Sequence, residues 1–179
     1  MKKIGITQVF HLFEKDFDDL NFTHRDKRLM DISSKMGVMS VRELYKKIDG
    51  AKIPSDRIGI VFASGTGPIS SITDFFNMLN PKGYIGINPG KFPNVMMSTP
   101  LFHISKEIQA TGPSVAMYIS KKMFEAVNYG RLQILRGRCD SVIVLYVNEG
   151  KSCFCLALEE EESAKKRNIP IRFLIDKIE

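Results

Sequence analysis

The sequence predicts an α/β domain whose sheet is mostly parallel and contains one antiparallel strand. Three observations lead to this fold class. Short apolar runs alternate along the chain with longer segments whose apolar residues recur at helical spacing. Near the carboxyl end, two such runs are separated only by Asn148–Lys151, a turn short enough for an antiparallel hairpin. The 179 residues, 44% of them hydrophobic, suffice for one core, and we expect residues 1–179 to form a single domain.

The first elements are a strand, a helix and a second strand. A short β-branched run predicts a strand over residues 3–9, and a polar, charged stretch follows it. Apolar residues at helical spacing, starting with Leu29, predict a helix over 28–48 with Gly50 as its stop signal. The nearly continuous apolar run at 57–63 is typical of a strand that is buried on both faces.

A glycine turn and a proline-rich segment come next. Ser64–Pro68 ends the second strand and leads into a helix over 69–79. Residues 80–100 contain four prolines and three glycines, so we expect mostly loop, and a loop of this length in a compact domain is typically functional. A short helix is predicted over 101–110.

The last third of the chain contains the remaining strands. A strand is predicted over 114–119 and a long helix over 120–136, which Ser120 can cap and Gly137 can end. The runs at 140–147 and 153–158 form the predicted hairpin, and 171–178 is the last predicted strand.

A short helix is predicted between the hairpin and the last strand. Residues 159–167 place acidic side chains first and basic ones last, the order that the helix dipole favours. We interpret Glu159–Glu162 as a solvated face of this helix and not as paired catalytic acids.

Composition and charge exclude several classes of function. Lys and Arg number 26 against 20 Asp and Glu, a net charge of +6 that permits acidic partners. The basic clusters Arg25–Arg28 and Lys165–Arg167 lack the interleaved aromatic residues of a nucleic-acid surface. No stretch approaches the roughly 18 apolar residues of a membrane span, and polar residues from Gln8 onward interrupt the first apolar run too early for a signal peptide. We expect a cytoplasmic protein that binds no nucleic acid and has no membrane span.

The three cysteines predict structural thiols. Cys139, Cys153 and Cys155 are few and odd in number, which favours reduced thiols in the cytoplasm. Cys153-x-Cys155 is not the C-x-x-C redox motif, and in a strand both side chains point to the same face. Because free cysteines are usually buried, we interpret all three in this way.

Motifs of other enzyme classes are incomplete. After Gly65-x-Gly67, the third glycine position of a dinucleotide-binding loop holds Ser70. Ser64 lacks the flanking glycines of a nucleophile elbow. No metal-ligand spacing links the histidines, which are His11, His24 and His103. The sequence therefore predicts no cofactor and no metal site.

Six segments carry a family resemblance because they occur in the family's order and at matching intervals. They are Arg28–Met36, Ile58–Gly67, Asn88–Asn94, Thr111–Val115, Arg136–Asp140 and Glu149–Gly150. Together they resemble motifs of the β-ketoacyl-acyl-carrier-protein synthases. In the same order, these motifs are the R-x-M-D helix start, the next strand with its glycine loop, the F-P-N loop, the G-P-S motif, a motif that ends in D and an E-G motif. The resemblance covers nearly the whole chain.

The resemblance implies the N-terminal half of a thiolase-like fold, with a five-stranded sheet and helices on both faces. In the family, a cysteine nucleophile stands nine residues after the glycine of the G-P-S motif, at a helix start whose dipole stabilises the thiolate. Counted from Gly112, this position is Lys121, with Ser120 beside it. The dipole disfavours the lysine charge, an amine would form a stable amide, and Ser120 has no visible base. The resemblance therefore implies no catalytic residue in this chain.

Length is the second departure from the family. Family members have two similar halves, and the second supplies two histidines, or a histidine and an asparagine, together with one oxyanion-hole donor. We expect this chain to end after one half. In the resembled fold the strand before the nucleophile pairs across a dimer axis, so 114–119 and the apolar helix after it imply a homodimer or a heterodimer with a ketosynthase.

These implications favour a non-catalytic ketosynthase-like protein, a pseudoenzyme of fatty-acid or polyketide biosynthesis. It would act by binding an acyl carrier protein, an active synthase or itself. Two alternatives are an acyltransferase or condensing enzyme with an unorthodox nucleophile, such as Lys121 or a cysteine, and a regulatory interaction module that kept only the fold. An inactive remnant is the remaining alternative.

Overall fold

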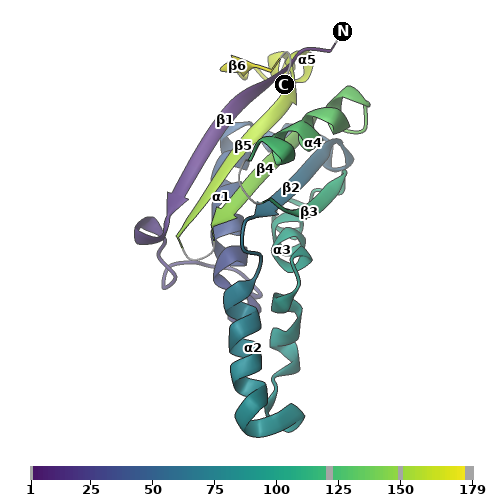
Figure 1. Cartoon of the computed structure of the whole chain (residues 1–179). Coiled ribbons are helices and arrows are strands. Elements are labelled where there is room, and N and C mark those ends of the chain that lie inside the picture. Colours follow the sequence, from purple (N-terminus) through teal and green to yellow (C-terminus); the bar gives the residue numbers. More distant parts are fainter. Residues whose placement is uncertain (1, 120–122, 149–150, 176–179) are drawn as a thin grey trace.

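A single mixed sheet organises the computed structural model, which describes residues 2–119, 123–148 and 151–175. Six strands lie in the order β3-β2-β4-β5-β1-β6 (Figure 1). Their bounds are β1 Ile4–Phe13, β2 Ile58–Ser64, β3 Ser114–Tyr118, β4 Ser141–Asn148, β5 Ser152–Glu160 and β6 Phe173–Leu174.

Strand directions confirm the predicted fold class. β2 pairs in parallel with both β3 and β4, whereas β5 runs antiparallel between β4 and β1. The five longer strands therefore form the expected mostly parallel sheet with one antiparallel strand, and β4 and β5 form the predicted hairpin. The two-residue β6 pairs antiparallel with β1 and adds a sixth strand at that edge.

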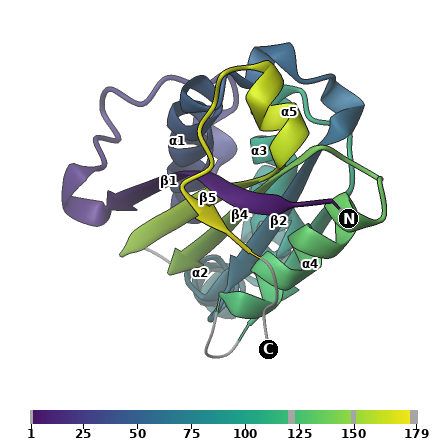
Figure 2. The same ribbon diagram turned by 90° about the horizontal axis from the view of Figure 1, so that it is seen from above.

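Helices cover both faces of the sheet, as expected. They are α1 Ile32–Lys47, α2 Ile69–Lys82, α3 Ser98–Ile108, α4 Phe124–Leu135 and α5 Glu161–Lys166. Figure 2 shows α1 and α3 on one side of the strands and α4 on the other. Leu44 and Ile104 belong to the core cluster on the first side, and Ile134 belongs to the cluster on the α4 side. The continuous apolar run of β2 contributes residues to both clusters, which is why all of its residues are buried.

The start of α1 differs from the predicted one. α1 begins at Ile32 because the Asp31 carboxylate caps it, accepting the Ser34 N–H at 2.8 Å. Leu29 therefore lies in a short 3-10 turn ahead of the helix and is 47% exposed, not directed inward. The predicted capping residue Ser120 lies outside the described residues. Gly137 ends α4 as predicted, with φ +69° and its N–H donated to the Ile134 carbonyl.

The predicted solvated helix face at Glu159–Glu162 is wrong for its first two residues, which belong to β5. β5 continues through Glu160 because it pairs with β1 to that point, with Glu160 opposite Ile4. Glu159 is consequently fully buried within the sheet, where it forms an ion pair with Arg167 and accepts the Thr7 hydroxyl at 2.9 Å. The short helix α5 starts only at Glu161.

The proline-rich segment forms an arm with α2 that projects from the sheet (Figure 1). The predicted loop contains two 3-10 segments, Gly83–Gly86 and Pro89–Val95, before α3 starts at Ser98. Pro100 is accommodated in the first turn of α3, where no intrahelical amide bond is lost. The arm ends in strongly exposed apolar residues, of which Tyr84 is 85% and Ile85 is 100% exposed. Within the described part of the chain, no helix has the length and apolar character needed to cross a bilayer.

Candidate functional site

The carboxyl ends of β2, β3 and β4 meet at one edge of the sheet. Ser64 at the end of β2 lies opposite Tyr118 on one side and opposite Val147 on the other. In open α/β sheets, ligands bind outside the carboxyl ends of parallel strands, where the following turns present side chains and amides. This edge is therefore where the fold places a candidate site.

The turn after β2 uses Ser64 for its own folding. The Ser64 hydroxyl accepts the Gly67 amide at 3.0 Å and the Thr66 amide at 3.4 Å, and Gly67 has φ +63°. An added Cβ at Gly65 would lie 2.9 Å from the Tyr146 hydroxyl, so a side chain there would require Tyr146 to shift. The segment is a tight strand-to-helix turn, as predicted, and the buried Ser64 hydroxyl is held as an acceptor.

β3 leads from this edge to the segment that the family resemblance assigns to the nucleophile. The Ile119 amide donates to the Ser64 carbonyl at 3.1 Å, which fixes the chain just before that segment. Ser120 and Lys121 themselves lie outside the described residues, which resume at Met123, directly before α4. The roles of these two residues stay predictions.

A small cavity beneath the turn holds Asp31. Asp31 and Ser64 both line it, and its volume is about 10 Å³, close to the smallest space that accepts a water molecule. Burial raises the pKa of Asp31, and its Oδ2 has no hydrogen-bond partner among the described residues. The cavity is too small for an acyl substrate.

Two larger cavities flank the 3-10 segment Pro89–Val95. One of about 390 Å³ lies between α2 and the start of α1, and Asp31, Asp74 and Phe75 line it. The other has about 440 Å³ and a mainly apolar wall that includes Phe102, with Asp26 and His103 on its polar side. Both volumes are in the range of small-ligand pockets.

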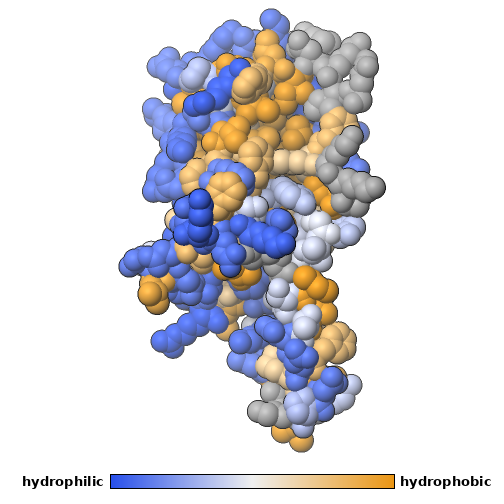
Figure 3. Space-filling model, turned by 60° about the vertical axis from the view of Figure 1, so that its left-hand side comes forward, coloured by the Kyte–Doolittle hydropathy of each residue, from blue (hydrophilic) through white to orange (hydrophobic). Residues whose placement is uncertain are grey.

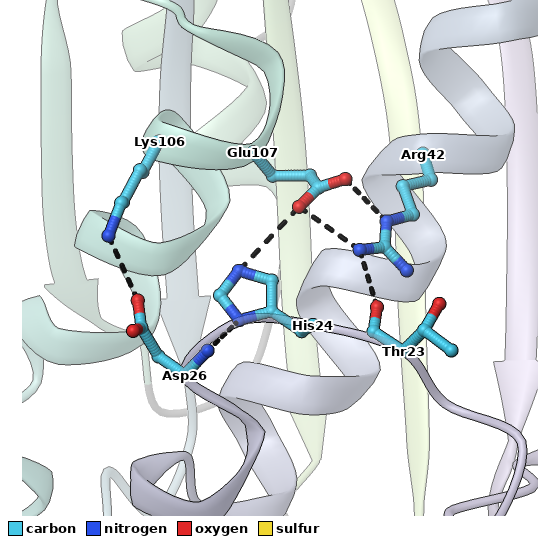
Figure 4. A network of polar contacts seen from close by, with 6 residues as sticks. All are labelled: Thr23, His24, Asp26, Arg42, Lys106 and Glu107. Carbon is cyan, nitrogen blue, oxygen red and sulfur yellow. Dashed lines mark hydrogen bonds and ion pairs between the residues drawn. The ribbon is translucent and has the colours of Figure 1, made fainter.

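A polar network joins the coil before α1 to α3 at the second cavity (Figure 4). His24 Nδ1 accepts the Asp26 amide at 2.9 Å, and the Asp26 carboxylate accepts the Lys106 ammonium at 2.9 Å. His24 Nε2 faces Glu107 Oε2 at 3.6 Å. Lys106 pairing lowers the pKa of Asp26, so this carboxylate is ionised at neutral pH.

Arg42 on α1 completes the network. Its guanidinium forms an ion pair with Glu107 and donates to the Thr23 carbonyl at 2.8 Å. The coil, α1 and α3 are thereby connected through a chain of charged groups.

His103 lies next to this network without joining its hydrogen bonds. It is 6% exposed, its ring centre is 5.9 Å from that of His24, and its Nδ1 has no partner among the described residues. Burial first, and then the neighbouring His24, lower the pKa of His103. Sequence spacing did not predict that His24, Asp26 and His103 meet, since only the packing of the coil against α3 brings them together.

The cysteines take no part in the candidate site. All three are buried free thiols, and Cys153 and Cys155 share one face of β5, as predicted. Burial raises the pKa of Cys139 to about 11 and that of Cys153 to about 12. They are protonated, inert thiols at neutral pH.

Comparison with known proteins gives a match in structure alone. No protein-family model and no curated sequence matches this chain. A solved complex described as a type II polyketide-synthase acyl-carrier protein with its ketosynthase bound to the hexaketide matches with TM-score 0.81 and 16% identity, over 96% of this chain and 66% of that chain.

Two further solved structures agree with that match. A β-ketoacyl synthase from Burkholderia phymatum STM815 has TM-score 0.77 and 14% identity, over 96% of this chain and 62% of its own. The ishigamide ketosynthase/chain length factor has TM-score 0.70 and 19% identity, over 82% of this chain and 49% of its own. The chain thus spans between 49% and 66% of these three chains. It has the thiolase-like fold of a β-ketoacyl-synthase half.

Proposed function

We propose that this chain is a non-catalytic ketosynthase-like protein of fatty-acid or polyketide biosynthesis. It acts as one ketosynthase-like half in the cytoplasm, by binding an acyl carrier protein, an active synthase or a second copy of itself. The observation that carries the proposal is the ketosynthase fold over 96% of the chain, combined with a lysine at the position that the sequence resemblance assigns to the nucleophile.

The chemistry of the chain supports a binding role over a catalytic one. A lysine amine that took an acyl group from a thioester would form an amide, which does not pass the group on. The three cysteines are buried, and burial raises their pKa values. Neither group resembles the low-pKa, accessible thiolate that acyl transfer requires.

The surface supports association with another protein. Within the described residues, β3 has no strand on its outer side, and Tyr118 at its end is 63% exposed. Figure 3 shows apolar surface gathered over the sheet and again toward the end of the α2 arm. On the α4 face of the sheet, Ile6, Tyr146 and Phe154 pack against the core cluster but stay partly exposed. Unpaired edges and apolar faces of this kind favour burial in an interface.

Two matched structures suggest the kind of partner. One is a complex of an acyl-carrier protein with its ketosynthase, and the other is a ketosynthase/chain length factor. We infer a partner of the same class, an acyl carrier protein or a ketosynthase, for this chain.

Titration with carrier proteins tests the proposal. Isotope-labelled acyl carrier protein is titrated with the purified chain, and we expect saturable chemical-shift changes confined to one face of the carrier. Binding to an active synthase is tested by co-purification of the chain with a full-length ketosynthase. Absence of binding to carrier, synthase and self would contradict the proposal and favour the regulatory module.

Mass spectrometry separates the catalytic alternative. The chain is incubated with acyl-carrier thioesters and digested, and we expect no acylated peptide. An acyl group on Lys121 or on a cysteine would favour the acyltransferase with an unorthodox nucleophile.

A further inference from the structure

We propose that His24, Asp26 and His103 form a binding site for a zinc-type divalent cation. One potential ligand atom from each of these residues lies within 4.8 Å of the other two. His24 and Asp26 come from the coil before α1, and His103 comes from α3. Figure 4 shows two of the three, His24 and Asp26, facing α3. The inference goes beyond the proposed function, since it involves no acyl group or carrier.

The donor set matches zinc chemistry. Zn²⁺ binds imidazole nitrogens and carboxylate oxygens, and two histidines with one carboxylate leave the fourth tetrahedral position for water. Tetrahedral ligand atoms around Zn²⁺ lie about 3.3 Å apart. The cluster, with its separations of up to 4.8 Å, therefore needs to contract by about 1.5 Å or less. Binding therefore requires side-chain rotations that bring the ligand atoms together by this amount.

Burial and an unmet polar atom point to a ligand at this place. His103 is 6% exposed, and its Nδ1 is buried without a hydrogen-bond partner in the described part of the chain. The His24 side chain is also 6% exposed. Buried ring nitrogens usually have a partner, and a bound ion is one of the groups that can supply it for His103 Nδ1.

The surroundings of His24 resemble the outer shell of a metal ligand. Metal-bound histidines usually direct their other ring N–H at a carboxylate, which fixes the ring. Glu107 Oε2 lies 3.6 Å from His24 Nε2, and the Arg42 guanidinium holds this carboxylate in place. Binding through Nδ1 would exchange the bond from the Asp26 amide for a bond to the cation.

Lys106 competes with the cation for Asp26. Its ammonium lies 2.9 Å from the Asp26 carboxylate, and its side chain is 46% exposed, so it can turn into solvent when a cation binds. The cavity of about 440 Å³ beside Asp26 and His103 provides access and room for a water ligand. Removing Lys106 should therefore strengthen binding, whereas removing a ligand should weaken it.

Calorimetric titration of the chelator-treated full chain with ZnCl₂ is the test. We expect one ion per chain, weakened about tenfold or more in His103→Gln and Asp26→Asn, and tightened in Lys106→Met. His11→Gln is the matched control, because His11 is the remaining histidine of the chain, lies on β1 and is exposed. Its affinity for Zn²⁺ should equal that of the wild type.

Co²⁺ absorption supplies a second readout that does not depend on stability. We expect the visible bands of a nitrogen and oxygen ligand set, absent in Asp26→Asn. If His103→Gln does not fold, Asp26→Asn and Lys106→Met decide the question. The proposal is overturned by absence of Zn²⁺ binding at micromolar to tens of micromolar concentrations in both wild type and Lys106→Met. Binding unchanged in His103→Gln or Asp26→Asn, or a thiolate-to-Co²⁺ charge-transfer band, overturns it as well.

Discussion

The helix start and burial act on the charge of Asp31 in opposite directions. Its Oδ1 caps α1 by accepting the Ser34 amide at 2.8 Å, and the positive end of the helix dipole favours a negative charge there. Burial opposes that charge, because Oδ2 is buried without a partner among the described residues. Burial is the stronger effect and raises the pKa of Asp31.

Replacing Asp31 should change how stability depends on pH. The folded chain keeps the Asp31 proton at pH values where the unfolded chain has lost it, so the free energy of unfolding falls as pH rises through this window. Asp31→Asn keeps the cap and cannot ionise. We expect urea unfolding to show this variant gaining stability over the wild type between pH 4 and pH 7.

Asp31→Ala is the matched comparison, because it removes both the charge and the cap. It should be about 1 kcal/mol less stable than Asp31→Asn at every pH. A wild-type chain whose stability relative to Asp31→Asn does not change with pH would contradict the burial argument.

Glu159 and Arg167 form a buried ion pair that holds the carboxyl-terminal segment on the sheet. Their side chains are 0% and 5% exposed, and Arg167 also donates to the Ile48 carbonyl at 2.6 Å. Burial raises the pKa of Glu159, and Arg167 and the Thr7 hydroxyl oppose that rise. The pair therefore compensates a charge that the core would otherwise exclude.

Arg167→Met should destabilise the fold by about 3–5 kcal/mol, because it leaves Glu159 buried without its counter-charge. Denaturant unfolding at pH 5 and pH 8 measures this loss. Without Arg167 the pKa of Glu159 rises further, so the loss should be larger at pH 8. Lys165→Met is the control, since Lys165 belongs to an exposed pair with Glu161, and its unfolding midpoint should hardly change. Equal losses of stability in Arg167→Met and Lys165→Met would contradict the stabilising role of the buried ion pair.

At the scale of elements, β3 is an edge strand of the sheet that the described residues form. The Ile60 amide bonds to the Pro113 carbonyl, and the Ile119 amide bonds to the Ser64 carbonyl. Because strand groups alternate in direction, the odd-numbered residues of β3 face β2. The amides of Ala116 and Tyr118 therefore point to the open edge, ready to pair with another strand.

Ala116→Pro should abolish self-association while leaving the fold intact. The proline removes one outward amide and no bond to β2, so light scattering should show the wild type as a dimer and this variant as a monomer at tens of micromolar. Circular dichroism checks that both are folded. The control is Phe173→Lys, which changes β6 at the opposite edge of the sheet. If the wild type is a monomer and also captures no ketosynthase, the proposal that β3 forms an interface is contradicted.

The element boundaries show what local patterns can determine. The continuous apolar run of β2 and the glycine that ends α4 are local signals, and the structure confirms both. Leu29 has the right spacing for α1 but lies outside it, because the Asp31 cap starts the helix later. Glu159 follows a helical charge pattern, yet pairing with β1 extends β5 through Glu160. Strand pairing over a long sequence distance decided that case.

At the scale of the whole molecule, the chain has the ketosynthase fold but spans between 49% and 66% of the three matched chains. The resemblance assigns the decarboxylating histidines and one oxyanion-hole donor to the second half of the family fold, whereas residues 1–179 resemble the first half. Lys121 stands at the expected nucleophile position. We therefore infer that a thiol alone would not create activity.

The chain alone should show no condensation or malonyl decarboxylation with acyl- and malonyl-carrier thioesters. Lys121→Cys should be equally inactive, because the thiol would still lack its base and the second oxyanion donor. Carbon dioxide release and product mass measure this directly. Wild-type turnover that disappears in Lys121→Ala would contradict the pseudoenzyme proposal.

The sequence by itself determined the fold class, the hairpin, the buried cysteines and the ketosynthase resemblance, because these follow from local apolar patterns and ordered motifs. Only the tertiary structure placed Glu159 beside Arg167 in the core and brought His24, Asp26 and His103 together. Residues far apart in the chain meet because of how the coil and helices pack on the sheet. Sequence spacing reports only local periodicity and does not predict that packing.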